Sequence, residues 1–575
     1  MCGILGYVGE HEAAPILLKG LKRLEYRGYD SAGLAVLSPE GEINIMKAKG
    51  RLSVIEERSE GGKLLPGRCG IGHTRWATHG EPSDLNAHPQ YSDDLCVVAV
   101  HNGIIENYQE LKNKLLKKGY TFNSATDTEV AVKLVDYYYK KYYGTPIDAI
   151  NKAMVRIRGS YSLVLLFKDF PGEIYAARKD SPLICGKSED GLFLASDATA
   201  ILEYTRDVYY IGDLQAVRLK GTELTFYDLN GDEIEIEPMH IDWDVNAAEK
   251  GGYEHFMMKE IHEQPKAVMD TLNSVIKEGR ADISVSGITD EELKTASEIC
   301  IVACGSAYHV GITMSYVIEE LCHVPVRVEL ASEFRYRRPV LLKDTLCLFI
   351  SQSGETADTL AALRLAKESG YKTFSIVNVL GSSIARESEH VLYTLAGPEI
   401  AVATTKAYSA QLAAAYAFAV RLAKVRGTID DKREEELCAE LLSLPDKIEK
   451  LLEDQKRIQW FASKYAAAKD IFLIGRNVDY AIALEGSLKI KEISYIHSEA
   501  YAAGELKHGT ISLIEEGTLV IGILTDKEIF EKTLSNMVEC KSRGAYLMGL
   551  TMKDNVHIED TADFTVYIPE TENFF

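Results

Sequence analysis

Several features that mark other protein classes are missing from this sequence, and each absence narrows its possible function. No run of 18 or more apolar residues occurs in the 575 residues, so no ordinary transmembrane helix is predicted. The N-terminus has no basic segment followed by an apolar run, so we expect no secretory signal peptide. Basic residues are also few, with 64 Lys and Arg against 86 Asp and Glu. The net charge of −22 argues against nucleic acid or an anionic membrane as a partner, because both bind basic surfaces.

Paired cysteines and metal or cofactor motifs are missing as well. The ten cysteines are scattered without a CxxC pair, which indicates reduced thiols in a cytoplasmic protein rather than disulfides or a zinc site. There is no HExxH motif and no GxGxxG motif after a predicted strand, so no metal and no cofactor is expected. With 46% hydrophobic and 26% charged residues, the composition is that of a soluble globular protein. The length predicts about three or four domains.

Against this background the segment Met1-Cys2-Gly3-Ile4 stands out. Removal of Met1, which the small Cys2 permits, places a thiol and an α-amino group on one residue. An α-amine has an ordinary pKa of about 7.7–8.0 and can serve as a general base for its own side chain. Four residues alone are equally typical of an ordinary chain start, so the interpretation depends on the motifs further along the chain.

Residues 1–240 alternate short apolar runs with helical patterns, which predicts stacked sheets flanked by helices. The expected strands are residues 4–8, 33–37, 43–48, 96–101, 161–167, 174–178 and 191–196. The expected helices are residues 11–24, 108–118, 127–142 and 146–155.

Four polar clusters interrupt these elements, at residues 24–33, 72–80, 101–103 and 126–129. Singly, each is typical of a turn or a helix cap; Asn102-Gly103 in particular is a common turn sequence. Together they supply what hydrolysis of a glutamine amide needs. Arg75 suits the α-carboxylate, Asp127 suits the α-ammonium, and Asn102 with the Gly103 N–H suits a tetrahedral oxyanion.

These motifs occur in the order found in class II (N-terminal nucleophile) glutamine amidotransferases, and the N-terminal half resembles that family over about 130 residues. The resemblance implies an αββα sandwich. It assigns Cys2 as nucleophile, Asn102 and Gly103 as oxyanion hole, and a substrate-binding set that is Arg75, Trp76, Thr78, His79 and Asp127. Trp76 resembles the family's ammonia-channel gate.

Residues 290–575 alternate apolar strands with amphipathic helices, the pattern of a doubly wound parallel sheet, and the pattern occurs twice. Residues 299–321 are mirrored by 470–493, and residues 346–377 by 519–550. Such a repeat indicates a duplicated domain with ligands at the carboxyl ends of the strands. The preceding Gly251-Gly252 and helical run resemble the join in glutamine–fructose-6-phosphate aminotransferases, the hexosamine-forming family.

In the first copy, residues 351–356 (Ser-Gln-Ser-Gly-Glu-Thr) lie between a strand and a helix, where hydroxyls and free N–H groups bind phosphate. A plain helix cap has the same pattern. The segment resembles the phosphate cradle of sugar isomerase (SIS) domains, which carries sugar-phosphate binding to Ser306, Ser351, Gln352, Ser353, Thr356 and Val402. Ala307 departs from the family, which usually has Ser there.

In the second copy, the spacing of Glu485, Lys489 and Glu492 puts all three on one helical face. A solvated ion pair has the same spacing. The resemblance gives Glu492 the proton transfer between C1 and C2 and His508 the opening of the sugar ring, with Lys489 and Glu485 positioning hydroxyls and tuning the base.

The combined prediction is an α/β protein that releases ammonia from L-glutamine and forms glucosamine 6-phosphate from fructose 6-phosphate. We expect the amidotransferase domain at residues 1–240, a linker and leading helix at 241–290, and SIS domains at 291–430 and 460–575. By the same resemblance we expect a homodimer through the SIS domains, with the partner supplying His508. No nucleic acid or membrane partner is predicted.

One departure leaves alternatives open. Family members continue past the strand at residues 566–570 with an apolar helix and a tail that holds a Lys for the sugar carbonyl, whereas this sequence ends at Phe575. We expect a truncated chain rather than a natural variant. A glutaminase with an inactive synthase half and a non-catalytic sugar-phosphate sensor are therefore the alternatives.

Overall fold

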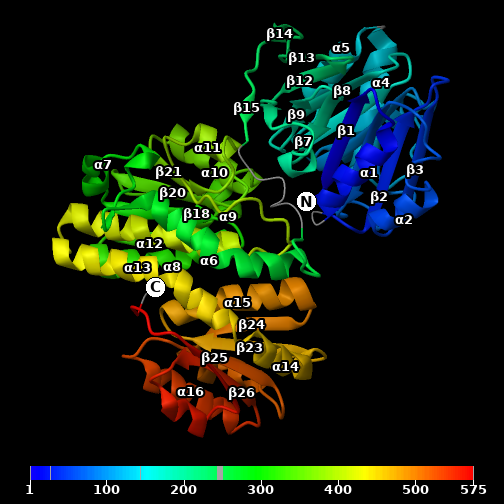
Figure 1. Cartoon of the computed structure of the whole chain (residues 1–575). Coiled ribbons are helices and arrows are strands. Elements are labelled where there is room, and N and C mark those ends of the chain that lie inside the picture. Colours follow the sequence, from blue (N-terminus) through cyan, green and yellow to red (C-terminus); the bar gives the residue numbers. More distant parts are fainter. Residues whose placement is uncertain (1, 26–27, 143, 242–249, 338, 574) are drawn as a thin grey trace. The chain divides into compact units, whose positions relative to one another are not determined.

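The computed structural model describes residues 2–25, 28–142, 144–241, 250–337, 339–573 and 575. The chain divides into two compact units, unit 1 (Met1–Glu249) and unit 2 (Lys250–Phe575), whose elements are labelled in Figure 1. The residues 242–249 of the predicted linker, and Arg27 of the first polar cluster, lie outside the described residues. Within the described ranges, no helix is both long and apolar enough to cross a membrane.

Unit 1 contains two antiparallel sheets. The eight-stranded sheet has the order β15-β11-β9-β10-β1-β4-β2-β3, and the seven-stranded sheet has the order β14-β13-β12-β8-β7-β6-β5. The strands are β1 (Gly3–Gly9), β2 (Ser31–Leu37), β3 (Ile43–Lys49), β4 (Cys69–Arg75), β5 (Gln90–Tyr91), β6 (Val97–Ile105), β7 (Gly159–Phe167), β8 (Glu173–Lys179), β9 (Ile184–Lys187), β10 (Gly191–Ala195), β11 (Asp207–Tyr210), β12 (Gln215–Lys220), β13 (Glu223–Tyr227), β14 (Glu233–Ile234) and β15 (Met239–His240). The helices are α1 (Ala13–Leu24), α2 (Leu52–Arg58), α3 (Tyr108–Leu116), α4 (Asp127–Tyr142) and α5 (Pro146–Met154).

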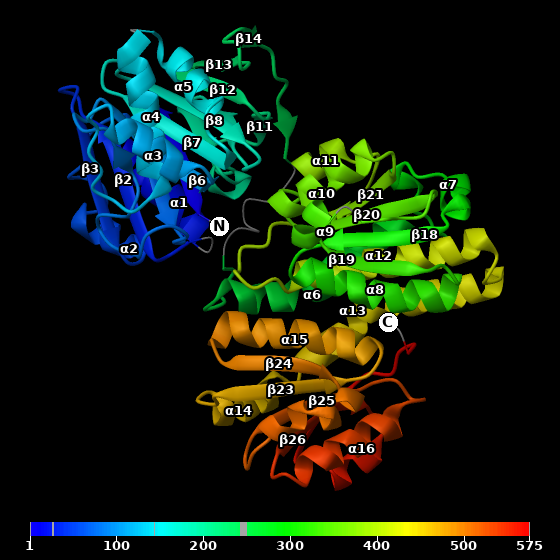
Figure 2. The ribbon, with the colours of Figure 1, turned by 180° about the vertical axis from the view of Figure 1, so that it is seen from behind.

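The alternation of side chains along the strands explains the layering of unit 1. In β1, Ile4 and Val8 join an apolar layer shared with strands of the second sheet, such as Val98 and Val164 of β6 and β7. Leu5 and Tyr7 point the other way, into the cluster beneath α1. Helices α3, α4 and α5 cover the outer face of the second sheet through a third cluster. The helices lie outside the two sheets (Figure 2), which confirms the predicted αββα sandwich.

The predicted strands and helices of unit 1 are present, with boundaries that differ by a few residues. The turn that an isolated Asn-Gly pair often forms is not present at Asn102-Gly103. Strand β6 continues through both residues, and they pair with Ser162 and Tyr161 of β7. Gly103 adopts a φ of +123°, and a Cβ there would lie 2.1 Å from the Ser160 carbonyl oxygen. Glycine therefore lets the strand pass close to its neighbour.

Unit 2 contains two five-stranded parallel sheets of identical strand order, β19-β18-β20-β21-β22 and β24-β23-β25-β26-β27. The strands are β18 (Glu298–Ala303), β19 (Val326–Leu330), β20 (Thr345–Ser351), β21 (Lys372–Val377), β22 (His390–Tyr393), β23 (Asp470–Gly475), β24 (His497–Ala502), β25 (Leu519–Leu524), β26 (Tyr546–Met552) and β27 (Phe564–Ile568), with a short hairpin of β16 (Ile276–Lys277) and β17 (Arg280–Ala281) before them. In both orders the second strand lies on one side of the first strand and the later strands lie on the other, as in doubly wound folds. All strands of these two sheets pair in parallel, which confirms the predicted parallel sheets.

The helices of unit 2 cover both faces of each sheet. They are α6 (Phe256–Val275), α7 (Asp290–Thr295), α8 (Ser306–Cys322), α9 (Ala331–Arg337), α10 (Ala357–Glu368), α11 (Ser383–Glu387), α12 (Lys406–Arg426), α13 (Asp431–Leu452), α14 (Gln455–Tyr465), α15 (Val478–Ser494) and α16 (Phe530–Lys541). Helix α12 packs against α6 and α8 to build the largest apolar core of the unit. Helix α8 also packs against α15, which joins the two copies (Figure 2).

The repeat extends to backbone dihedral angles. Helix α8 is preceded by Gly305 (φ 58°, ψ −133°) and α15 by Asn477 (φ 51°, ψ −127°), so both helices begin from the same unusual conformation. Each runs for 17 residues and ends in a left-handed residue, His323 in the first copy and Tyr495 in the second. The two copies therefore share one fold in detail, as the internal sequence repeat predicts.

Candidate functional site

The first candidate site surrounds Cys2 at the start of β1. The backbone N–H of Trp76 donates to Cys2 Sγ at 3.2 Å, and the thiol lies 3.6 Å from the Trp76 carbonyl. Burial raises the pKa of the Cys2 thiol. A thiol with a raised pKa needs a base to become a nucleophile at neutral pH.

Asn102 and His73 lie directly beside Cys2. Asn102 Nδ2 donates to the Cys2 carbonyl at 2.8 Å, and Asn102 Oδ1 lies 3.0 Å from His73 Nε2. His73 comes from β4 and Asn102 from β6, one strand of each sheet, and His73 is fully buried. No local sequence pattern indicates this contact, because the two residues are brought together only when the sheets stack.

Arg75 is 3% exposed at the end of β4. Its Nη2 donates to the His79 and Gly80 carbonyls, whereas its buried Nη1 has no hydrogen-bond partner among the described residues. The loop after β4 is held by Asp30, whose carboxylate accepts from the Ala77 N–H. A charged donor left unpaired in a preformed loop is suited to bind a carboxylate.

Asp127 is the first residue of α4 and is 4% exposed. Its Oδ2 accepts from Ile105 N at 2.9 Å, which links the helix to the end of β6. Thr126 Oγ1 accepts from the Glu129 N–H, so the segment is also the helix cap that its sequence indicates.

The remaining predicted residues of this site lie at its rim. Trp76 is 46% exposed and packs edge-on against Tyr29, with ring centroids 5.2 Å apart. Thr78 is exposed, and the partly buried His79 ring packs edge-on against Tyr108. The exposed Gly103 follows Asn102. All of the predicted residues of unit 1 therefore lie on or next to β1, β4, β6, α4 and the loop after β4.

The second candidate site begins at the carboxyl end of β20. Ser351 Oγ lies 3.0 Å from Thr356 Oγ1 and accepts from Gly354 N at 3.1 Å, while Ser353 Oγ accepts from Glu355 N. Gly354 has a φ of +62°, which bends the loop back over the helix start. Gln352 and Ser353 are partly exposed beside this loop, and α10 begins directly after Thr356. Hydroxyls around a helix N-terminus form an anion-binding geometry.

Val402 lies on a loop before α12 and is 58% exposed. The carboxylates of two buried or partly buried acidic residues accept hydrogen bonds from backbone N–H groups of this loop. Glu260 of α6 accepts from Ile400 N and Ala401 N, and Glu399 accepts from Thr405 N and Ala407 N. Burial, followed by the charge of Glu399, raises the pKa of Glu260 to about 7.

Glu485, Lys489 and Glu492 meet on α15, as their spacing predicts. Lys489 Nζ lies 3.3 Å from Glu485 Oε1 and donates to Glu492 Oε2, and it also donates to Ser306 Oγ at 3.1 Å. This last contact joins the charged face of α15 to the N-terminus of α8. The charged face is therefore a contact between the two copies rather than a solvated surface.

Sequence reasoning missed His309. Its Nδ1 lies 2.7 Å from Glu485 Oε2, so Glu485 sits between His309 and Lys489. His309 is three residues after Ser306 in α8, and this spacing places both on one helical face. That spacing was the available signal.

His508 is not brought to the others. It is exposed at the end of a 3₁₀ segment, Ala503–His508. Within the described part of the chain, no hydrogen bond or ion pair connects it to Glu485, Lys489 or Glu492.

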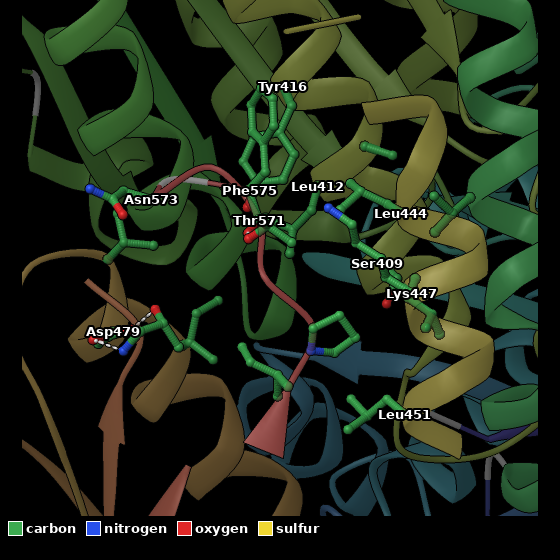
Figure 3. Close-up of a pocket in the computed structure, with 18 of the residues that line it drawn as sticks. Ser409, Leu412, Tyr416, Leu444, Lys447, Leu451, Asp479, Thr571, Asn573 and Phe575 are labelled. Carbon is green, nitrogen blue, oxygen red and sulfur yellow. Dashed lines mark hydrogen bonds between the residues drawn. The ribbon is translucent and has the colours of Figure 1, made fainter. Parts of the chain in front are cut away.

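A cavity of about 280 Å³ lies elsewhere in unit 2, between α12, α13 and the second sheet (Figure 3). Its lining is mostly apolar, with Leu412, Tyr416 and Leu444 on one side and Asp479 at the start of α15. Asp479 accepts from the Thr525 N–H at 2.9 Å and from its hydroxyl. None of the predicted site residues lines this cavity.

Comparisons with known proteins agree with this arrangement. A family model described as a glutamine amidotransferase domain matches residues 73–203, and an SIS domain model matches residues 292–421 and 464–575. A glutamine–fructose-6-phosphate aminotransferase [isomerizing] of Clostridium acetobutylicum is 52% identical over 100% of this chain and 94% of its own length. The protein of the same name from Caldanaerobacter subterraneus subsp. tengcongensis is 53% identical over 99% of this chain and 93% of its own length.

Among solved structures, unit 2 is similar to the C-terminal domain of glucosamine-fructose-6-phosphate aminotransferase from Francisella tularensis. The TM-score is 0.55 at 37% identity, over 57% of this chain and 92% of that domain. An identity above half that extends over the whole chain establishes common descent. The chain belongs to the glutamine–fructose-6-phosphate aminotransferase [isomerizing] family.

Proposed function

We propose that the protein hydrolyses L-glutamine in unit 1 and transfers the ammonia to fructose 6-phosphate in unit 2, with isomerization to glucosamine 6-phosphate. The observation that carries this proposal is the full-length identity to aminotransferases of that name. The alternatives of a lone glutaminase and of a non-catalytic sensor are not favoured by it. The geometry of both sites suits the two half-reactions.

In unit 1 the chemistry begins with Cys2. After removal of Met1, the free α-amine takes the thiol proton, and Sγ attacks the carboxamide carbon of glutamine. Arg75 Nη1, the unpaired donor, binds the α-carboxylate, while Asp127 binds the α-ammonium. Asn102 Nδ2 and the Gly103 N–H stabilise the oxyanion. Collapse, with the thiol proton passed from the α-amine to the leaving nitrogen, expels ammonia and leaves a thioester, which water hydrolyses to glutamate. Trp76, Thr78 and His79 enclose the substrate at the rim.

In unit 2 the phosphate of the sugar binds the loop of Ser351, Gln352, Ser353 and Thr356, and Val402 and Ser306 line the sugar. Ammonia condenses at C2 of the open-chain ketose. Glu492 then moves a proton between C1 and C2, completing the shift to an amino-aldose. Glu485 and Lys489 hold Glu492 in position through their ion pairs on α15. No metal or cofactor enters either half of this proposal.

The direct test measures two products. With glutamine and fructose 6-phosphate, we expect glutamate and glucosamine 6-phosphate in equal amounts. The variant Cys2→Ala should lose both products, by a factor of about 10⁴ or more for a lost nucleophile, whereas Cys96→Ala, another partly exposed thiol, should retain them. Glutamate without amino sugar would favour the glutaminase alternative. Neither product, with sugar phosphate still bound, would favour the sensor. Full activity in protein that retains Met1 by intact mass would contradict the role of the α-amine.

We also propose a homodimer through unit 2 in which His508 serves the site of the second copy. The support is that His508 is exposed and, in the described chain, unconnected to Glu492. The variants Glu492→Gln and His508→Ala should each be inactive in amino-sugar formation. Mixed after reversible dissociation, they should recover about a quarter of wild-type activity, because half of the dimers then hold one complete site. No recovery in verified mixed dimers would contradict the exchange.

The ten free cysteines favour a cytoplasmic location, where thiols stay reduced.

A further inference from the structure

Three buried histidines lie behind Cys2 and have no part in the chemistry proposed above. The rings of His73 and His88 pack against each other, tilted by 30° with centroids 4.3 Å apart, and His101 precedes Asn102 in β6. All three side chains are almost fully buried. Burying a polar imidazole costs free energy unless it forms hydrogen bonds. The hydrogen-bond partners of these histidines therefore indicate their role.

The partners of His73 fix its protonation state. Its Nε2 faces the His101 carbonyl at 3.1 Å and Asn102 Oδ1 at 3.0 Å, while its Nδ1 has no partner among the described residues. A backbone carbonyl can only accept, so Nε2 must carry the hydrogen. The Asn102 atom that faces this hydrogen must then be the amide oxygen. The amide nitrogen is thereby turned toward Cys2, whose carbonyl it reaches at 2.8 Å.

We propose that His73 is a positioning residue for glutamine hydrolysis, which sets the side-chain amide of Asn102 so that its N–H groups, and not its oxygen, face the reacting carbonyl. This inference rests on the proposed function of unit 1 and deepens it. Without the His73 donor, only the hydrogen bond to the Cys2 carbonyl selects the orientation of the amide, and the flipped form would turn an oxygen toward a developing oxyanion. Such a form repels the charge that it should stabilise.

A second layer holds His73 and the strand in place. Thr128 Oγ1, at the start of α4, lies 2.7 Å from His88 Nε2 and 2.9 Å from His101 Nδ1. The hydroxyl has one hydrogen, so it can donate to at most one of the two rings and must accept from the other. The His88 ring in turn packs against the His73 ring, and His101 supplies the carbonyl that His73 binds. Burial lowers the pKa of His73 to about 3 and also lowers the pKa values of His88 and His101, which favours neutral rings.

A matched pair of amide substitutions tests the proposal in the full-length protein. The side-chain nitrogen of Gln reaches about as far as His Nε2, whereas that of Asn ends near the position of Nδ1. We therefore expect His73→Gln to keep kcat for glutamate release within about fivefold of wild type. His73→Asn should lower kcat about 10- to 100-fold, which is a smaller loss than deletion of an oxyanion donor causes. KM for glutamine should change less, because Arg75 and Asp127 hold its other end. Alkylation of Cys2 by iodoacetamide, which needs no oxyanion hole, should proceed at wild-type rate in both.

A double-mutant cycle separates positioning from general structural damage. If His73 acts through Asn102, the change His73→Asn should cost less than about twofold once Asn102→Ala is present. The same fold loss in both backgrounds, or equal activities of His73→Gln and His73→Asn, would overturn the inference while glutamine hydrolysis by the wild type stands. A wild type that releases no glutamate would overturn the proposed function itself, and with it this role for His73.

Discussion

At the residue scale, the Cys2 site depends on close approaches that leave no room for larger side chains. Gly103 follows Asn102, the proposed oxyanion donor, and pairs with Tyr161 of β7. A Cβ at Gly103 would meet three backbone atoms of Ser160 and Tyr161 at 2.1, 2.7 and 2.9 Å. Backbone atoms cannot move aside as a flexible side chain can. The position of Asn102 is therefore coupled to the spacing between β6 and β7.

The variant Gly103→Ala tests this coupling, with Gly119→Ala as a matched control. Both glycines have positive φ, +123° and +92°, but a Cβ at Gly119 would meet nothing within 4 Å. The control should lower the free energy of unfolding by about 1–2 kcal/mol for the left-handed conformation alone. Gly103→Ala should lower it by about 2–5 kcal/mol, because overpacking adds to that strain, and should abolish glutamine hydrolysis. Urea titration of both variants measures the difference. Equal stabilities would show that the strand spacing is not constrained at Gly103.

At the scale of elements, the buried carboxylates beneath the Val402 loop join α6 to the start of α12. Glu260 accepts from the Ile400 and Ala401 N–H groups, and Lys406 of α12 forms an ion pair with Glu263 of α6 at 2.7 Å. Burial and the neighbouring Glu399, whose own pKa is raised, oppose the charge on Glu260, while its hydrogen bonds and Lys406 favour it. The Val402 loop is therefore hydrogen-bonded to a carboxyl group, that of Glu260, which changes its charge near neutral pH.

This predicts a pH dependence of stability that one substitution removes. The pKa of Glu260 rises from 4.5 in the unfolded chain to about 7 in the folded protein, so the folded state retains a proton that the unfolded state has lost between these values. The contribution of Glu260 to the free energy of unfolding is fully present below about pH 4.5. It is lost as the pH rises to about 7, a change of roughly 3 kcal/mol at most. Glu260→Gln should flatten the curve of unfolding free energy against pH in this window. The exposed Glu254→Gln should leave the slope as in wild type. Parallel curves for Glu260→Gln and wild type would contradict the assignment.

Elements were predictable from sequence where their signal is local. Helix α4 begins at Asp127 and ends at Tyr142, as its periodicity and cap predict, because a cap and an apolar stripe lie within one segment. The contacts of His73 with Asn102 and of His309 with Glu485 join residues 29 and 176 positions apart, and they form only when separate elements pack. An Asn-Gly pair taken alone often forms a turn, but strand pairing with β7 overrides that local preference at Asn102-Gly103.

At the scale of the whole molecule, the two copies in unit 2 share a fold but differ in the residues at equivalent positions. The helix caps fix their alignment, with Gly305 opposite Asn477 and Thr356 opposite Ile529. The hydroxyls of Ser351, Ser353 and Thr356 then correspond to Leu524, Asp526 and Ile529. Conversely, Glu485 and Lys489 of α15 correspond to Thr313 and Val317 of α8, whereas Glu492 corresponds to Glu320. The hydroxyl-lined loop is therefore confined to the first copy, and the Glu485–Lys489 ion pair to the second.

This asymmetry predicts one sugar phosphate per chain despite two copies of the fold. In the second copy, Asp479 corresponds to Ala307, and its carboxylate already accepts from Thr525 N and Oγ1 where a phosphate would bind. A phosphate there would face the carboxylates of Asp479 and Asp526 and would be repelled. Isothermal titration with fructose 6-phosphate should give one equivalent per chain. Ser351→Ala should weaken binding about ten- to hundredfold, because Ser351 Oγ orders both Gly354 N and Thr356 Oγ1. Thr525→Val changes the corresponding loop of the second copy and should leave the affinity unchanged. Two equivalents in the wild type, or weaker binding by Thr525→Val, would show that the second sheet also binds phosphate.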